Sequence, residues 1–268
     1  IYLLQQWSDK WLLKLNIHKC KIISIGSRVQ QDNCYSLQLD HQIFNLTRES
    51  HITDLGIEID EKLDFSLHIH NKINKAYQVL GIIRRNFKCL TKTAFILIYK
   101  AMVRSLLEYN TPVWSPHKIS DIHEIERVQR KATKILAVCK RMSYEERLRY
   151  LNLPTMKYRR LRGDMIQAYK IITDKYDNKV VPLLELSNVT RTRGHDLKLA
   201  SHRTVYNRRK YFFSNRIVNI WNNLSSYVID APSVDAFKKR LDIYWYNQDC
   251  KYVYTAKLTG TGGSPIEL

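Results

Sequence analysis

The sequence is poor in cysteine, and its cysteines follow no pattern. It has five in 268 residues, an odd number, and no two of them form a Cys-x-x-Cys pair. This pattern fits reduced thiols, as in an intracellular protein, better than a disulfide frame. The five are Cys20, Cys34, Cys89, Cys139 and Cys250.

Long apolar runs are also absent. No stretch reaches the roughly 20 apolar residues that a membrane span needs. The N-terminal residues contain neither a basic region nor an initiator Met, so no secretory signal is expected. We therefore expect a soluble chain without a membrane partner, and one that is a fragment of a longer protein.

Acidic residues are scarce relative to basic ones. The 25 Asp and Glu residues are outnumbered by 44 Lys and Arg residues, which gives a net charge of +19 at pH 7. Such an excess predicts a polyanionic partner, with nucleic acid as the leading candidate. A basic protein whose cations are merely solvated is the alternative. The length suffices for one large or two ordinary domains.

The first residues predict an amphipathic helix. Leu3, Trp7, Trp11 and Leu15 recur at a spacing of four, which places them on one face. We expect this helix to run from Leu3 to Asn16 and to pack on a sheet. Short alternating or β-branched segments follow and predict that sheet, small and mostly antiparallel. They are residues 21–25, 35–39, 42–46 and 51–60.

Helical spacing takes over after these segments. Thr91 is the expected N-cap of a helix whose apolar stripe is Phe95, Ile98, Met102 and Leu106. Further helices are expected at 73–87, 122–135 and 158–172, and another begins at the capping-box pattern Ser143-Tyr-Glu-Glu146. The expected fold class is therefore α+β, mainly α.

The order of motifs resembles one known family. Residues 3–23 resemble the D region of reverse transcriptases from jockey-like non-LTR (LINE) retrotransposons, and Leu55-Gly56-Ile57 is similar to their E region, the primer-grip hairpin. The resemblance continues in order to residue 245, and this order makes it specific. Thumb-like segments are 63–69, 80–87, 107–109, 113–116 and 125–133, and segments like the post-thumb extension are 144–151, 159–164, 192–195, 221–224 and 237–238.

The resemblance implies a division of the chain into four parts. A small antiparallel palm-remnant sheet with a helix would be followed by a helical thumb and a helical basic extension. The expected bounds are 1–65 for the palm remnant, 66–139 for the thumb, 140–250 for the basic extension and 251–268 for a flexible tail.

The catalytic strand of that family is missing. Such polymerases hold two metal ions with paired carboxylates, yet no two Asp are adjacent here. The nearest acids, Asp60, Glu61 and Asp64, fit a turn between a strand and a helix better than a metal site. We therefore expect no cofactor on this chain, with Mg²⁺ held by the parent enzyme, and no polymerisation by the chain alone.

The resemblance implies a chemical role for one lysine. Lys19 ends an Asn-x-x-Lys pattern whose Lys approaches the triphosphate and donates a proton to departing pyrophosphate in the family. A solvated Lys at a helix end is the alternative, and Lys21 is close enough to compete for either role. For Leu55, Gly56 and Ile57 the family implies contact with the primer. The structural alternative is a strand with a bulge or a close backbone approach at Gly56.

Two groups of cations are the expected nucleic-acid contacts. The first follows the first thumb-like helix, although helical spacing does not put all its members on one face. The second is interleaved with Tyr206, Tyr211 and Phe212, a mixture that suits phosphate contact with base stacking; a charged exterior over an aromatic core, with Phe213 and Trp221 inside, is the alternative. The groups are Lys72, Lys75, Arg84, Arg85 and Lys88, then Arg191, Arg193, Arg203, Arg208, Arg209 and Lys210, with Lys198 and Arg216 also in the second stretch.

Zinc is not expected. The His and Cys spacings match no known ligand frame. The residues concerned are His18, Cys20, Cys34, His41, His68 and His70.

The function implied is that of the C-terminal part of a retrotransposon RNA-directed DNA polymerase. Its partners would be RNA, an RNA/DNA hybrid or a DNA primer, together with the upstream fingers and palm of the same polyprotein. It would act in the nucleus and cytoplasm as a ribonucleoprotein. A standalone nucleic-acid-binding protein derived from such an element is the alternative, and a pseudogene product without selected function is a third.

Overall fold

The computed structural model describes residues 2–26, 34–39, 42–177, 179–187 and 194–259. The chain forms two compact units, Ile1–His68 and Ile69–Leu268. Helices dominate and the strands are few and short, so the α+β, mainly α fold class is confirmed. The finer division into palm remnant, thumb, extension and tail stays a prediction. Within the described residues, no helix combines the length and apolar character needed to cross a membrane.

In the described part of the first unit, the strands form three separate pairs where one sheet was expected. β2–β3 and β5–β6 are antiparallel hairpin pairs, while β1–β4 is parallel and only two residues long on each side. A parallel pair needs a long connection, which the β2–β3 segment supplies here. The elements are α1 (Tyr2–Lys10), β1 (Lys21–Ile22), β2 (Ser36–Leu39), β3 (Gln42–Asn45), β4 (Thr47–Arg48), β5 (His51–Asp54) and β6 (Ile57–Asp60).

The N-terminal helix is shorter than predicted. α1 ends at Lys10 because Leu12 takes a left-handed backbone, with φ 56°, and the Leu13 N–H bonds to the Ser8 carbonyl at 3.0 Å. This arrangement closes a helix C-terminus. Leu15 therefore lies outside the helix, and the stripe is exposed where core packing was expected. Trp11, for example, exposes 61% of its surface.

Most of a long helix, α2 (Ser66–Asn86), belongs to the second unit, whose first residue is Ile69. Its buried apolar residues, which stand beside the buried His68, recur at helical spacing, so this face of the helix faces the core. They are Ile69, Ile73, Ala76, Leu80 and Ile83.

The next helix buries a different stripe from the one expected. Thr91 Oγ1 accepts the Ala94 N–H at 3.3 Å, which confirms the N-cap. Phe95 is buried as expected, but the other core residues are Tyr99, Val103 and Leu107, while Met102 is exposed. The helix is α3 (Lys92–Ile98) continued by a π-helical stretch, Tyr99–Arg104, and α4 (Ser105–Glu108).

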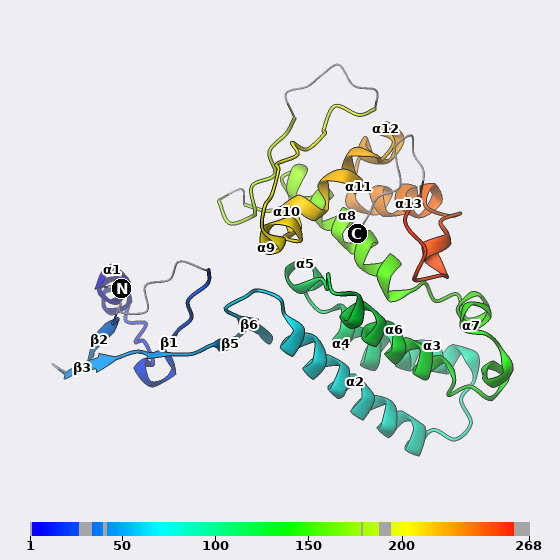
Figure 1. Ribbon diagram of the computed structural model, residues 1–268, viewed down its shortest axis with the longest axis horizontal. Coiled ribbons are helices and arrows are strands. Elements are labelled where there is room, and N and C mark those ends of the chain that lie inside the picture. The colour runs from blue at the N-terminus through cyan, green and yellow to red at the C-terminus, as the bar shows by residue number, and fades with distance from the viewer. Residues whose placement is uncertain (1, 27–33, 40–41, 178, 188–193, 260–268) are drawn as a thin grey trace. The chain divides into compact units, whose positions relative to one another are not determined.

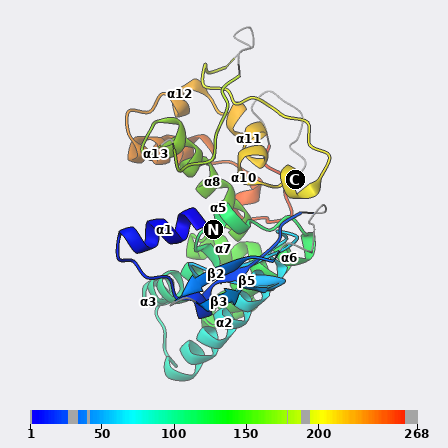
Figure 2. The ribbon, with the colours of Figure 1, turned by 90° about the vertical axis from the view of Figure 1, so that its left-hand side faces the viewer.

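The rest of the second unit is built around α8, which contacts α5, α6, α11 and α13 (Figure 1). Figure 2 shows α11, α12 and α13 gathered near α8. The capping box is confirmed, because the Glu146 N–H donates to Ser143 Oγ and the Ser143 N–H donates to Glu146 Oε2. The helices are α5 (Thr111–Trp114), α6 (Ile119–Thr133), α7 (Tyr144–Leu151), α8 (Met156–Ile172), α9 (Asn207–Lys210), α10 (Phe213–Arg216), α11 (Val218–Asn222), α12 (Ser226–Ile229) and α13 (Val234–Tyr244).

Candidate nucleic-acid interface

β5 and β6 form a hairpin with a two-residue turn. Asp54 pairs with Ile57, and the turn residues Leu55 and Gly56 have φ values of 45° and 77°. Two successive positive φ values define the mirror-image turn that matches the twist of paired strands. Leu55 and Gly56 are exposed at the tip, whereas Ile57 is buried. Gly56 thus marks a turn and not a bulge, and only the tip residues are placed to reach a ligand.

The acids after this hairpin organise the chain before α2. Asp60 accepts the backbone N–H of Lys62 at 2.8 Å and of Phe65 at 2.9 Å, and Asp64 accepts that of Ser66 at 2.9 Å. These bonds occupy carboxylate oxygens that a metal ion would need, so the cluster does not fit Mg²⁺. Within the described residues, no three His, Cys, Asp or Glu side chains gather as a metal site. His41 lies outside the described residues.

Lys19 ends a single 3₁₀ turn, Ile17–Lys19, and is exposed. Ile17 is buried beneath it, which anchors the turn. The position leaves the ammonium group in solvent, and its role toward pyrophosphate stays a prediction.

The cations of α2 do not converge. Lys72 is half-buried, with Nζ 5.9 Å from the ring centroid of Tyr109. Arg84 and Arg85 are exposed near the end of the helix and, at 100° per residue, point away from the Lys72 side. Lys75 and Lys88 are also exposed, Lys88 two residues beyond the helix.

The second predicted group contains one tight cluster. Arg208, Arg209 and Lys210 lie on α9, and the aromatic residues Tyr206 and Phe212 flank them. All five side chains are exposed, with 71% of Tyr206 and 51% of Phe212 accessible. We call these five residues the late basic cluster. Its cations take no part in the ion pairs found among the described residues.

The other cations of this group differ in exposure and in pairing. Arg203 is exposed in the extended segment before α9, whereas Arg191 and Arg193 lie outside the described residues. Arg216, counted as a surface cation from the sequence, instead forms a buried pair in which its Nε and Nη2 donate to Asp164 at 3.0 and 2.9 Å. Phe213 and Trp221 are core residues, as expected.

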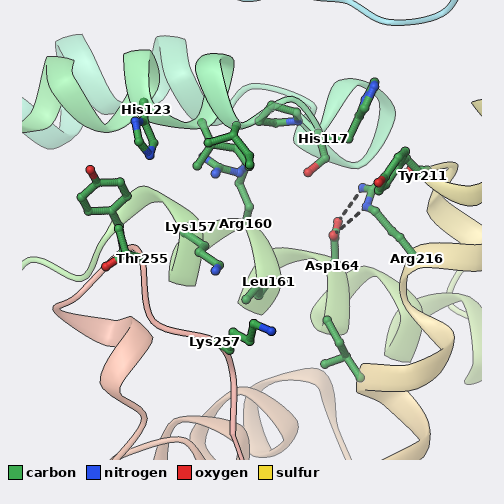
Figure 3. A pocket seen from close by; sticks show the side chains of 16 residues that line it. His117, His123, Lys157, Arg160, Leu161, Asp164, Tyr211, Arg216, Thr255 and Lys257 are labelled. Carbon is green, nitrogen blue, oxygen red and sulfur yellow. Dashed lines mark hydrogen bonds and ion pairs between the residues drawn. The ribbon is translucent and has the colours of Figure 1, made fainter. Parts of the chain in front are cut away.

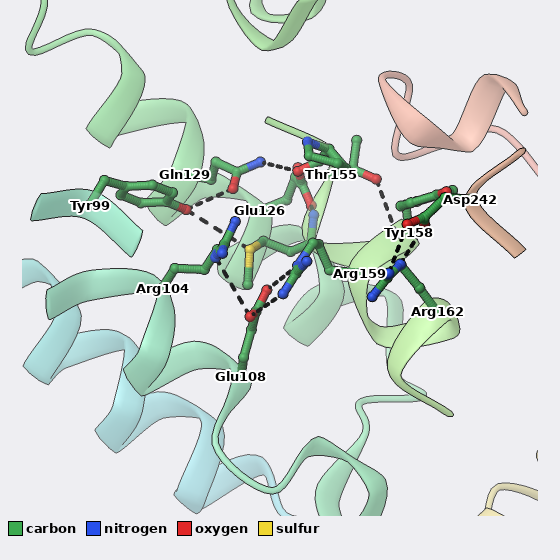
Figure 4. Close-up of polar contacts among 12 residues, drawn as sticks. Tyr99, Arg104, Glu108, Glu126, Gln129, Thr155, Tyr158, Arg159, Arg162 and Asp242 are labelled. Carbon is green, nitrogen blue, oxygen red and sulfur yellow. Dashed lines mark hydrogen bonds and ion pairs between the residues drawn. The ribbon is translucent and has the colours of Figure 1, made fainter. Parts of the chain in front are cut away.

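Two arginines of α8 are also engaged in structural pairs, as Figure 4 shows. Arg159 donates to both oxygens of Glu108 at 2.7 and 2.8 Å, and Arg162 donates to both oxygens of Asp242 at 2.6 and 2.8 Å. Two-point pairs of this kind hold helices together and remove these cations from the surface available to phosphate.

A buried polar network joins α6 to the segments around it. The Tyr99 hydroxyl donates to Gln129 at 2.7 Å, and Gln129 donates to the Pro154 carbonyl at 3.0 Å (Figure 4). Glu126 accepts the Tyr144 hydroxyl and the Met156 N–H. Burial raises the pKa of Glu126, while these hydrogen bonds oppose the rise. The network is largely internal, with Tyr144 at its partly exposed edge, and serves packing.

Sequence reasoning missed which arginines are paired and which are buried. The partner of Arg159 is 51 residues away and that of Arg162 is 80 residues away. No local spacing marks such pairs. The only sequence signal is that acids such as Glu108 and Asp164 fall within otherwise apolar or basic helical segments.

Comparison with known proteins gives two distant relatives. The chain is 26% identical over 135 residues to the RNA-directed DNA polymerase from mobile element jockey of Drosophila melanogaster, a match that covers 48% of this chain and 14% of that polymerase. It is 24% identical over 140 residues to the uncharacterized protein B0403.1 of Caenorhabditis elegans, covering 51% of this chain and 71% of that protein.

These relatives support a distant link to the reverse transcriptases of mobile elements. The match to the jockey polymerase spans much less than two thirds of that protein, so its activity is not transferred by the comparison. No protein-family model matches the chain. No solved structure matches it.

Proposed function

We propose that the chain corresponds to the thumb and adjoining C-terminal regions of a non-LTR retrotransposon RNA-directed DNA polymerase and binds its template and primer. The late basic cluster carries this proposal, because its three exposed cations form no ion pair within the described residues and are flanked in sequence by two exposed aromatic residues. The relationship to the jockey polymerase and the net charge of +19 support it.

The physical basis is phosphate contact combined with stacking. Arg208, Arg209 and Lys210 attract the backbone of RNA, of an RNA/DNA hybrid or of a DNA primer, and Tyr206 and Phe212 stack on unpaired bases. Phosphate contacts position a strand without reading its sequence, so binding is expected to be largely independent of sequence. The exposed hairpin tip supplies a second contact, toward the primer.

A standalone binding protein is the second candidate. The uncharacterized relative from Caenorhabditis elegans favours it, because the matched region makes up 71% of that protein and leaves little length for a polymerase core. The transcript upstream of Ile1 decides between the two. A strand with adjacent Asp residues in the same reading frame supports the polymerase, and its absence supports the binding protein.

The direct test measures the affinity of the chain for a primed RNA template by fluorescence anisotropy. Replacing Arg208, Arg209 and Lys210 with Ala should weaken binding about tenfold or more at moderate salt. The matched control replaces Lys134, Lys140 and Arg141, which are equally exposed on another part of the second unit. Equal losses in both triple variants would contradict the proposal, because bulk charge would then explain the affinity.

No polymerisation is expected from this chain alone. The sequence has no adjacent Asp residues, and the Asp60 cluster is committed to backbone hydrogen bonds. Purified chain with primed RNA, nucleotides and Mg²⁺ should extend no primer beyond a protein-free control. Template-dependent extension would overturn this part of the proposal.

A further inference from the structure

A cavity of 280 Å³ opens within the second unit, between α6, α8, α11 and the segment after residue 251 (Figure 3). Pockets that hold small ligands begin at about 300 Å³, so the space suits one small molecule and not a large cofactor. Part of the lining is apolar, from Ile119, Ile122, Leu161 and Ile220. The rest of the lining is mostly aromatic or charged.

The most informative charged residue in the lining is Arg160. Only 5% of its surface is exposed, and its Nη1 atom is buried without a hydrogen-bond partner. Burial lowers the pKa of Arg160 to about 10, which still leaves the guanidinium protonated at neutral pH. A buried donor without a hydrogen-bond partner is unfavourable, so this end of the guanidinium has room for an acceptor.

Nearby acids do not complete it. Asp164 is the acidic residue among those that line the cavity, and it is held in its two-point pair with Arg216. Glu126 acts on Arg160 electrostatically, but its oxygens accept the Tyr144 hydroxyl and the Met156 N–H. Asp164 and Glu108 also act on the charge of Arg160, but the hydrogen bonds of Glu126 and Asp164 go to other donors, so the Nη1 donor of Arg160 is open to an added acceptor such as a phosphate oxygen.

Further cations stand beside Arg160. Lys157 lies one turn earlier on α8, and its Nζ donates to the Ala256 carbonyl at 3.0 Å. Lys257 lines the cavity from the C-terminal segment. In Figure 3, Lys157 and Lys257 project toward the same space from these two elements. Cations from separate segments thus converge on the cavity.

Aromatic rings form another part of the wall. The ring of His117 stacks on that of Tyr211, with centroids 4.5 Å apart and planes 14° apart. His123 meets Tyr254 edge to face at 5.3 Å. Flat rings beside apolar side chains favour a planar aromatic ligand.

We infer that this cavity binds the phosphate monoester of a planar aromatic molecule, the chemistry of a nucleoside monophosphate. The phosphate binds at Arg160 and Lys157, where the guanidinium supplies paired donors, and the ring lies against the aromatic wall. The inference goes beyond the nucleic-acid interface and does not rest on it, because the late basic cluster shares no residue with the cavity lining.

The first test uses the unmodified chain and isothermal titration calorimetry with three probes. AMP should bind at least tenfold more tightly than adenosine, which lacks the phosphate, and more tightly than inorganic phosphate, which lacks the ring. AMP that binds no better than adenosine would overturn the anion site. Inorganic phosphate that binds as tightly as AMP would overturn the aromatic half of the inference.

Two variants then locate the site. Arg160→Met keeps the volume without the charge and should weaken AMP about tenfold or more, while thermal unfolding shifts downward because the buried Glu126 loses a nearby positive charge that lowers its pKa. Lys257→Ala, at an exposed position, should also weaken AMP while thermal unfolding stays close to that of the wild type. Unchanged AMP affinity in both variants would place binding elsewhere and contradict the inference.

Competition experiments show whether the ligand is a free nucleotide or the phosphorylated end of a nucleic acid. A 5′-phosphorylated oligonucleotide that displaces AMP better than its unphosphorylated twin would identify a nucleic-acid end as the source, and equal displacement would identify the free nucleotide. Binding of primed RNA by Arg160→Met should equal that of the wild type. Loss of AMP binding with normal RNA binding therefore separates this cavity from the proposed function.

Discussion

Arg159 of α8 and Glu108 of α4 form a two-point ion pair, with the guanidinium nitrogens 2.7 and 2.8 Å from the carboxylate oxygens (Figure 4). Arg104 lies 3.6 Å from the same carboxylate. The hydrogen bond to Glu108 raises the pKa of Arg159. One acid thus balances two cations and links a helix of the predicted thumb to a helix of the predicted extension.

Removing the charge of Glu108 should therefore destabilise the second unit. Glu108→Gln leaves Arg104 and Arg159 partly buried without their counter-charge, and the free energy of unfolding in urea should fall by about 2 kcal/mol. Glu145→Gln is the control, since Glu145 pairs with Arg149 at the exposed surface and should matter little. Losses of equal size in both variants would refute this account of the buried pair.

Acid should weaken the fold through His195. This side chain is buried, its Nε2 lies 3.1 Å from the Trp221 carbonyl oxygen, and burial lowers its pKa below 6.5. The unfolded state binds the proton more readily, so stability is complete above pH 6.5 and declines as pH falls from there toward the folded pKa.

Urea unfolding between pH 5 and pH 8 measures this effect. His195→Gln should flatten the decline, whereas His70→Gln, at an exposed position of α2, should leave it unchanged. A decline of the same steepness in His195→Gln would show that another group is responsible.

The turn residue Leu55 should limit the stability of the β5–β6 hairpin. Its φ of 45° is left-handed, which costs an L-residue with a large side chain about 1–2 kcal/mol, whereas Asn tolerates it well. Leu55→Asn should slow amide hydrogen exchange in β5 and β6, and the β-branched Leu55→Val should speed it. Identical exchange in the three proteins would argue against this turn.

Local chemistry was predictable from the sequence, whereas a shift in helical phase was not. The cap at Thr91 and the capping box at Ser143 depend on residues three positions apart, and both are present. The stripe after Phe95 was wrong because regular α-helical spacing was assumed. Core residues four apart drift by about 40° per step on an α-helix, and the π-helical stretch from Tyr99 to Arg104 absorbs that drift.

Pairing across distant segments also escaped the sequence. Arg216 and Arg208 lie in the same basic stretch of the sequence, which does not distinguish them. In the structure, Arg216 is buried against Asp164, whereas Arg208 is exposed. The end of α1 was also predicted wrongly. The apolar spacing of Trp7 and Trp11 continues past Lys10, but the left-handed backbone at Leu12 ends the helix. Both outcomes depend on tertiary or backbone energetics that spacing does not carry.

The salt dependence of RNA binding tests the central claim most directly. Each phosphate contact contributes a slope of about −0.7 to −0.9 to a plot of log affinity against log salt. If Arg208, Arg209 and Lys210 contact phosphates, their joint replacement with Ala should flatten the slope for primed RNA by about 2 to 3 units, equally for unrelated sequences. An unchanged slope would contradict the account and assign the late basic cluster to an ordinary solvated surface.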